Sequence, residues 1–130
     1  MTNTIISTSL APQAIGPYSQ AVWAGDHLYL SGQIALDPAT NEFHNASFER
    51  ELHQIFANMA GVLHAANLHF DDIIKITVYL TDFNDFATLN RLMADTFTAP
   101  YPARTTIAVA ALPKNARVEI DAIAYRAKRQ

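Results

Sequence analysis

The stretch SFERELHQIFANMAGVLHAA, residues 47–66, decides the fold together with IKITVYL, residues 74–80. In the first segment apolar residues recur at steps of three and four, the period of an amphipathic helix. Ser47 or Asn45 can cap this helix, and Asn67 can take the left-handed conformation after its last turn. In the second segment Ile74, Ile76, Val78 and Leu80 alternate with Lys75, Thr77 and Tyr79, which predicts a half-buried strand.

Further elements are predicted on both sides of this pair. Upstream, residues 4–7 form a strand, residues 11–18 a loop rich in proline and glycine, and residues 21–30 a hairpin. Downstream, a second helix spans about residues 86–98, and two strands joined at residues 113–115 follow it. This order predicts one domain over residues 1–130 with an α+β fold, in which two helices cover one face of a mixed sheet. We expect the other face to carry Tyr79, Thr106, Glu119, Ile123 and Tyr125.

Composition restricts the class of protein and its partners. Charged residues make up 16% of the 130 residues, against roughly 25% in typical soluble domains, so part of the surface is expected to be buried against other copies of the chain. The net charge of −3 argues against a nucleic-acid partner, which selects basic faces. No apolar run reaches the roughly 20 residues of a membrane span. The chain lacks cysteine and a secretory signal pattern, which predicts a cytoplasmic location.

Two charged residues in the last two predicted strands could carry chemistry. Arg104 follows Pro102 at the start of an extended run, and a guanidinium is a planar fork that binds a carboxylate with two parallel hydrogen bonds. Glu119 interrupts an apolar alternation, and a carboxylate that holds water can act as a general base. From these residues alone two interpretations stay open: an enzyme for small acids, or a surface Arg and a surface Glu on solvated strand faces.

A hairpin between these two strands would keep the two residues apart. If its turn is centred near Lys114, Arg104 lies opposite about residue 124 and Glu119 opposite about residue 109, which separates them by roughly 17 Å. Both can then contact one small acid only if the arginine side chain reaches a long way or if Glu119 comes from another subunit. The face that each residue occupies depends on a one-residue register.

Four stretches resemble the RidA (YjgF) family. They are APQAIGPYSQA at residues 11–21, LSGQI and LDPAT within residues 30–40, DFNDFATLN at residues 82–90, and YPAR, LPK and EIDAIA within residues 101–124. Their order and spacing match as well, so the resemblance covers essentially the whole chain. It implies a chorismate-mutase-like fold in a homotrimer, whose sheets pack into a barrel and whose sites lie at subunit interfaces.

The resemblance also implies an activity without a cofactor. Members hydrolyse reactive 2-imino acids, such as 2-iminobutanoate and 2-iminopropanoate, to 2-oxo acids and ammonia. Arg104 corresponds to the residue that binds the substrate carboxylate, and Glu119 to the residue that positions the attacking water. The other implied substrate-binding residues are the site-wall tyrosine Tyr18, the backbone of Ser31 and Gly32, the helical Asn90, and Thr106.

Each of these residues also has a structural alternative. Arg104 could form an ion pair at a strand end, Glu119 could be a solvated strand residue, and Tyr18 could be a buried core tyrosine. Ser31 and Gly32 could form a simple strand-end turn, and Asn90 could bond a nearby loop.

The chain departs from the family pattern at several positions. Thr106 stands where a cysteine is common; a contact through its backbone N–H survives this change, whereas pocket shape and substrate preference need not. Glu51 and Leu52 stand where Gln and Thr are frequent, on a helix segment that we expect to be exposed and unimportant. Asn67 replaces a glycine after the first helix.

Other chemistries have little support. The five histidines are scattered without metal-binding spacing, so no metal site is predicted. Two rival functions remain. One is a non-catalytic 2-oxo acid-binding or regulatory protein of the same fold, and the other is a ribonuclease or translation inhibitor, an activity also ascribed to this family.

Overall fold

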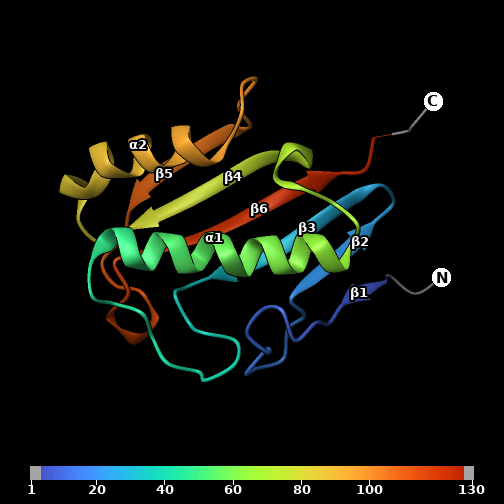
Figure 1. Cartoon of the computed structure of the whole chain (residues 1–130), viewed down its shortest axis with the longest axis horizontal. Helices are drawn as coiled ribbons and strands as arrows, with labels where there is room; N and C mark the ends of the chain where they lie inside the picture. Colours follow the sequence, from blue (N-terminus) through green and yellow to red (C-terminus); the bar gives the residue numbers. More distant parts are fainter. Residues whose placement is uncertain (1–3, 128–130) are drawn as a thin grey trace.

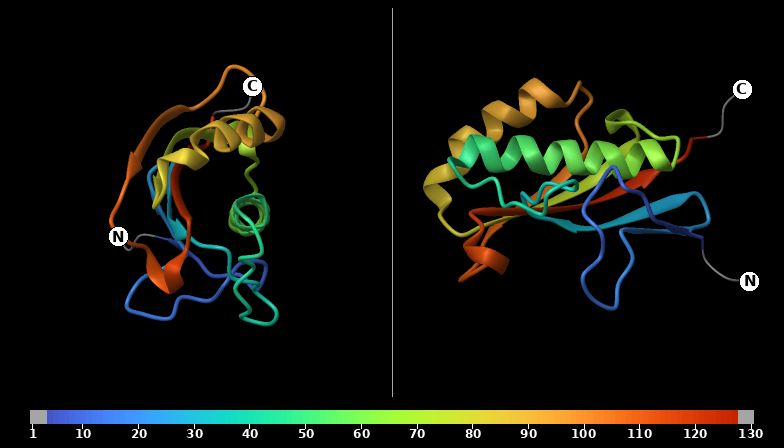
Figure 2. Two further views of the ribbon diagram at one scale, coloured as in Figure 1. Left: turned by 90° about the vertical axis from the view of Figure 1, so that its left-hand side faces the viewer. Right: turned by 60° about the horizontal axis from the view of Figure 1, so that its bottom comes forward.

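The computed structural model describes residues 4–127, which form a sheet with two helices packed on one of its faces (Figures 1 and 2). The strand order is β1-β2-β3-β6-β4-β5. The strands are β1 (Ile5–Ile6), β2 (Ala21–Ala24), β3 (His27–Gln33), β4 (Ile73–Leu80), β5 (Ala103–Ala108) and β6 (Val118–Tyr125), and the helices are α1 (Phe48–Ala65) and α2 (Phe86–Thr96). The predicted α+β fold, with two helices on one face of a mixed sheet, is confirmed.

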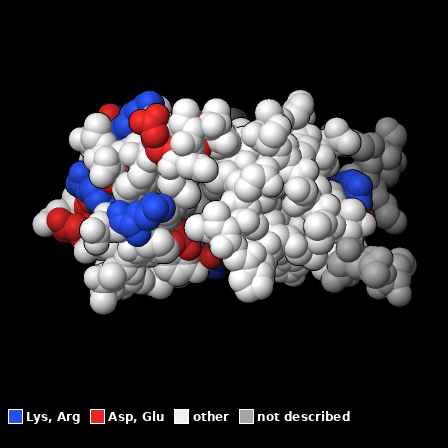
Figure 3. All heavy atoms as spheres, turned by 90° about the horizontal axis from the view of Figure 1, so that it is seen from below, with Lys and Arg blue, Asp and Glu red and all other residues white. Residues whose placement is uncertain are grey.

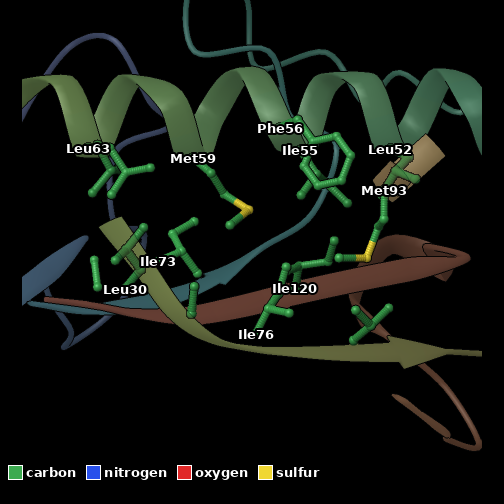
Figure 4. Close-up of a cluster of buried hydrophobic side chains, with 14 of the residues drawn as sticks. Leu30, Leu52, Ile55, Phe56, Met59, Leu63, Ile73, Ile76, Met93 and Ile120 are labelled. Carbon is green, nitrogen blue, oxygen red and sulfur yellow. The ribbon is translucent and has the colours of Figure 1, made fainter. Parts of the chain in front are cut away.

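Helix α1 forms where the apolar period predicts it. The Ser47 side chain, rather than that of Asn45, accepts the N–H of Arg50 at 3.0 Å and caps the helix. Asn67 has a φ of 60° after the last turn, as predicted. The apolar stripe of α1 lies on the sheet, where Leu52, Ile55 and Met59 meet residues such as Ile76 and Ile120 (Figure 4). Burial of each such side chain contributes about 1.5–3 kcal/mol.

Strand β4 begins one residue earlier than its alternating pattern predicts. Ile73 is buried and Ile74 is 44% exposed, so the prediction that Ile74 faces the core is wrong. The pairing of β4 with β6 is irregular between Ile73 and Lys75. An irregularity of this kind changes the face of the residues before it and leaves the later alternation intact.

The predicted hairpin between the last two strands is wrong. Helix α2 carries the chain back across the sheet, so β5 pairs with β4 in parallel, as in other strand–helix–strand units. Strand β6 enters antiparallel between β3 and β4. Arg104 therefore pairs with Ile76 rather than with residue 124, and Glu119 pairs with Tyr79 rather than with residue 109.

The sheet face without helices is the open face. Residues paired across neighbouring strands point to the same face, so the pairing of Glu119 with Tyr79 places both on the open face, as predicted. Thr106 pairs with the buried Val78 and points toward the helices, so its predicted place on the open face is wrong. The open face also exposes large apolar side chains: Tyr29, Ile107 and Tyr125 are 48%, 42% and 36% exposed.

Two residues in the first turns of α1, Glu51 and Leu52, are buried rather than exposed. Glu51 is 1% exposed and Leu52 is fully buried, which contradicts the expectation for this segment. Glu51 lies three residues after Phe48 and four before Ile55, so it shares their helix face. Within residues 4–127, neither helix combines the length and the hydropathy that crossing a membrane requires.

Candidate active site

The first cavity brings together four of the predicted residues. It has a volume of about 370 Å³ and lies between the loop before β2 and the strands β3 and β6. Tyr18, Ser31, Gly32 and Glu119 line it. Tyr18 is 52% exposed, which contradicts the alternative of a buried core tyrosine.

Gly32 forms the floor under the carboxylate of Glu119. A Cβ added to Gly32 would overlap Oε2 of Glu119 and lie 3.0 Å from its Cδ. The backbone is irregular here, because the pairing of β3 with β6 shifts between Leu30 and Gln33. Only glycine therefore leaves space for the carboxylate at this point.

Glu119 is half-buried and its charge is disfavoured. Burial, and secondarily the charge of Asp121, raise the pKa of Glu119 above its usual value. Asp121 accepts a hydrogen bond from the Tyr79 hydroxyl at 2.8 Å, which raises the pKa of Tyr79. A carboxylate with a raised pKa is a stronger base, and such groups are frequent at functional sites.

The donors of Ser31 are used within the chain. Its hydroxyl donates to the carbonyl of Ser19 at 2.6 Å, and its N–H donates to the carbonyl of Gln20 at 3.0 Å. These two bonds join the loop before β2 to β3. Ser31 therefore shapes the wall of the cavity beside Tyr18.

The second cavity holds the other charged residue. It has a volume of about 380 Å³, and Arg104, Asn90, Met93 and Tyr101 are among the residues that line it. The Arg104 guanidinium donates to Sδ of Met93 at 3.5 Å and lies 5.5 Å from the centroid of the Phe86 ring. Among the ion pairs of residues 4–127, none includes Arg104. Its guanidinium is thus free to bind an anion.

The two cavities lie on opposite sides of the sheet. Arg104 pairs with the fully buried Ile76 and points toward α2, whereas Glu119 lies between the core residues Val118 and Ile120 and points to the open face. Strand β4 separates their strands, a distance of roughly 10 Å across the sheet. Within one chain the two residues cannot contact the same small molecule, so each cavity holds only some of the residues predicted for the site.

Thr106, which the resemblance implied to be a substrate-binding residue, lines neither cavity. Its Oγ1 is buried without a hydrogen-bond partner among the described residues. The sequence carries no signal that the residues around Arg104 form a binding site. The apolar period of the second helix predicts that Phe86 and Met93 face inward, and Tyr101 is indicated only as part of a family motif.

No cofactor or metal site stands out in the part of the chain that the structure describes. Residues 4–127 contain no group of three or more His, Asp or Glu side chains placed to hold a metal ion. What the two cavities offer is a cation beside an amide in one, and a half-buried carboxylate beside a phenol in the other.

Known proteins closely resemble this chain. A 2-iminobutanoate/2-iminopropanoate deaminase from Dermatophagoides farinae is 50% identical over 119 residues, which cover 92% of this chain and 93% of the relative. The human protein of the same name is 45% identical over 122 residues, 94% of this chain and 89% of the relative.

Solved structures share the fold. RidA from the Antarctic bacterium Psychrobacter sp. PAMC 21119 superimposes with a TM-score of 0.91 at 43% identity and covers 95% of this chain and 99% of that chain. TdcF from E. coli, solved with bound serine, gives a TM-score of 0.87 at 41% identity, with coverage of 95% and 99%.

The family described as endoribonuclease L-PSP matches residues 8–126, nearly the whole chain. The four motifs that resemble RidA lie inside this range, at residues 11–124. The chain therefore belongs to the endoribonuclease L-PSP family, the family of RidA and YjgF.

Proposed function

We propose that this protein hydrolyses reactive 2-imino acids, such as 2-iminobutanoate and 2-iminopropanoate, to 2-oxo acids and ammonia. The observation that carries the proposal is the division of the predicted residues between two cavities. The Arg104 guanidinium, which has no ion-pair partner within residues 4–127, lines one cavity with Asn90, and Glu119 lines the other with Tyr18 and Gly32. Relatives with this activity in their name, at 45–50% identity, support it.

Each group has a defined task in this reaction. Arg104 binds the substrate carboxylate with two hydrogen bonds, which fixes the adjacent imine carbon. Glu119 takes a proton from water, whose oxygen attacks that carbon, and returns this proton to the imine nitrogen, which gives a carbinolamine. The carbinolamine hydroxyl then passes its proton through Glu119 to the amine nitrogen, so that ammonia leaves as the C–O bond becomes a carbonyl. Tyr18 covers the reacting carbon, and no cofactor takes part.

We propose that the complete site forms between neighbouring subunits of a homotrimer. Arg104 of one subunit and Glu119 of the next would then face one substrate, which the opposite faces of the sheet exclude within a chain. The open face offers apolar surface for such contacts. The lack of cysteine supports our placing the trimer in the cytoplasm.

The family description also names a ribonuclease activity. Figure 3 shows most charged side chains of the face seen from below gathered toward one end, some basic atoms at the opposite end, and a broad uncharged area between them. From residue 4 to residue 36 the only charged residue is Asp26. A ribonuclease needs basic surface for the phosphates, so this charge distribution favours the deaminase.

Mixed oligomers of two inactive variants test both the reaction and the shared site. Arg104→Ala and Glu119→Gln are each expected to lose imine hydrolysis. Unfolding and refolding them together at equal amounts should restore roughly a quarter of the sites, because that share combines an intact Arg104 with an intact Glu119 from the next subunit. A site built within one chain would give no recovery.

The same assay separates the rival functions. Imine is generated in situ, and its decay is followed with and without protein. Binding of 2-oxobutanoate by the unmodified protein without faster imine decay would favour a binding or regulatory protein. A ribonuclease would be favoured if the unmodified protein cleaves RNA without accelerating imine decay and if this cleavage persists in Arg104→Ala.

A further inference from the structure

Among residues 4–127, Glu119 has no hydrogen-bond partner that would orient its carboxylate. Its side chain accepts no hydrogen bond from a residue in the described range 4–127, and the groups that influence its ionisation are its burial and the charge of Asp121. A general base is usually held by a third group. Here the main chain of β6 and the floor at Gly32 must fix the carboxylate.

A buried carboxylate holds the residue before β6. Oε1 of Glu51 accepts the backbone N–H of Arg117 at 2.9 Å, and Glu51 is only 1% exposed. The carbonyl of Arg117 accepts the N–H of Thr81 at 3.2 Å. Both main-chain groups of Arg117 are therefore bound, one by α1 and one by the residue after β4.

The Arg117 side chain strengthens this attachment. Its guanidinium donates to Oδ1 of Asp85 at 2.7 Å and lies 5.6 Å from the centroid of the Phe48 ring. Glu51, Asp85 and Phe48 thus hold the entry of β6 from two sides, the start of α1 and the turn before α2. We call Glu51, Asp85 and Arg117 the strand clamp.

We propose that Glu51 is a positioning residue for Glu119 and acts through the strand clamp. Arg117 precedes Glu119 by two residues in an extended chain, so a shift at Arg117 passes directly to the carboxylate. The carboxylate has little tolerance for such a shift, because Gly32 already lies in contact distance beneath it. The inference rests on the proposed function, in which Glu119 is the base.

A purely stabilising role for Glu51 predicts different behaviour. In that case any loss of activity would follow the loss of folded protein, and every variant of equal stability would have equal turnover. A positioning role predicts a lower kcat in fully folded protein. It also predicts an unchanged KM, because the substrate carboxylate is bound by Arg104 from the other cavity.

Two substitutions at Glu51 separate the roles. Glu51→Gln keeps an oxygen that can accept the Arg117 N–H, and Glu51→Leu removes the acceptor at similar volume. We expect Glu51→Gln to keep wild-type kcat and Glu51→Leu to lose about 10²-fold, since a displacement near 1 Å has effects of this size. Leu63→Ala, far along α1, is the control for stability: it creates a core cavity and should leave kcat unchanged.

Arg117→Lys is a milder change to the strand clamp and provides a second test in case Glu51→Leu does not fold. It preserves the backbone N–H and weakens the contact with Asp85. The expected result is a smaller fall in kcat with KM unchanged. Equal kcat for the wild type, Glu51→Leu and Arg117→Lys would overturn the positioning role.

The titration of Glu119 gives a readout that does not depend on turnover. Carbon-13 labelling of the glutamate carboxyls, with assignment by Glu119→Gln, reports its midpoint in each variant. We expect the midpoint to fall toward that of an exposed glutamate in Glu51→Leu and to stay in Glu51→Gln. A wild type that does not hydrolyse imine would refute the proposed function, whereas an unmoved midpoint in Glu51→Leu would refute the strand clamp.

Discussion

Replacing Gly32 by alanine should displace the carboxylate of Glu119 while Glu119 itself stays unchanged in the sequence. The added Cβ would overlap Oε2 of Glu119 and lie 3.0 Å from Cδ, closer than carbon atoms normally approach. To reach an ordinary contact the carboxylate has to move by roughly 1 Å. A displacement of this size is expected to lower kcat by about 10²-fold, which corresponds to about 2.7 kcal/mol of transition-state stabilisation.

The assay is the decay of an imine generated in situ, with 2-oxobutanoate affinity measured in parallel. Gly32→Ala should keep most of this affinity, because Arg104 lines the other cavity. The matched control is Gly25→Ala in the turn between β2 and β3. Gly25 has a φ of 61° and nothing within 4 Å of an added Cβ, so this change strains the backbone and should leave kcat unchanged.

A double-mutant cycle identifies the route of the effect. If Gly32→Ala acts by moving the carboxylate, it should cause no further loss in a Glu119→Gln background. Losses that add independently in the double variant would show that Gly32 acts on something else. Wild-type kcat in Gly32→Ala would refute the reasoning altogether.

Three further outcomes are expected. Arg104→Lys should lose nearly all 2-oxobutanoate binding in titration calorimetry, since a point charge cannot reproduce the fork; near wild-type affinity would contradict the two-bond contact. The acidic limb of the profile of kcat/KM against pH should lie above pH 4.5, because burial and Asp121 raise the pKa of the base Glu119; a limb at or below that value would exclude Glu119. Burial also raises the pKa of Glu51, so the wild type should lose unfolding free energy as pH rises through that pKa. Glu51→Gln should not show this part of the loss in urea unfolding, and parallel curves for the two proteins would contradict the shift.

The local elements were readable from the sequence because their signals are local. The apolar period fixed α1, and Ser47 and Asn67 marked its ends. Strand pairing is not local. Two strands joined by a short turn look like a hairpin, and only the return of the chain through α2 explains why β5 pairs with β4 instead. The sequence did carry one signal for the parallel pairing of β4 with β5: a helix lies between these two strands, as in other strand–helix–strand units.

The burial of Glu51 was also predictable in principle. Its spacing from Phe48 and Ile55 puts it on the apolar stripe, yet a carboxylate on a helix is exposed in most proteins. Its partner is the N–H of Arg117, 66 residues away in the sequence. A contact with such a separation leaves no local pattern, so the sequence could reveal the position on the helix but not the reason for the charge.

The family motifs pointed to candidate site residues but not to their arrangement. Of the residues that the resemblance implied, Arg104, Glu119, Tyr18, Ser31, Gly32 and Asn90 line the two cavities, whereas Thr106 lines neither. Their division between the faces depends on register, because a slip of one residue exchanges the faces of a whole strand. A sequence motif does not reveal such a slip. The pairing of Arg104 with Ile76 determines which face of the sheet Arg104 occupies.

The register of β5 gives a physical reason to expect a second subunit. Every residue of this edge strand except Thr106 is exposed, so burial in one chain scarcely specifies which face points inward. Two contacts favour the present register. Arg104 contacts Met93 on the helix side, and Lys75 donates to the Thr105 hydroxyl at 2.9 Å on the open face. This register leaves Ile107 42% exposed on the open face and Arg104 without a carboxylate partner among residues 4–127. A neighbouring chain that covers Ile107 would stabilise the same register that directs Arg104 into the second cavity.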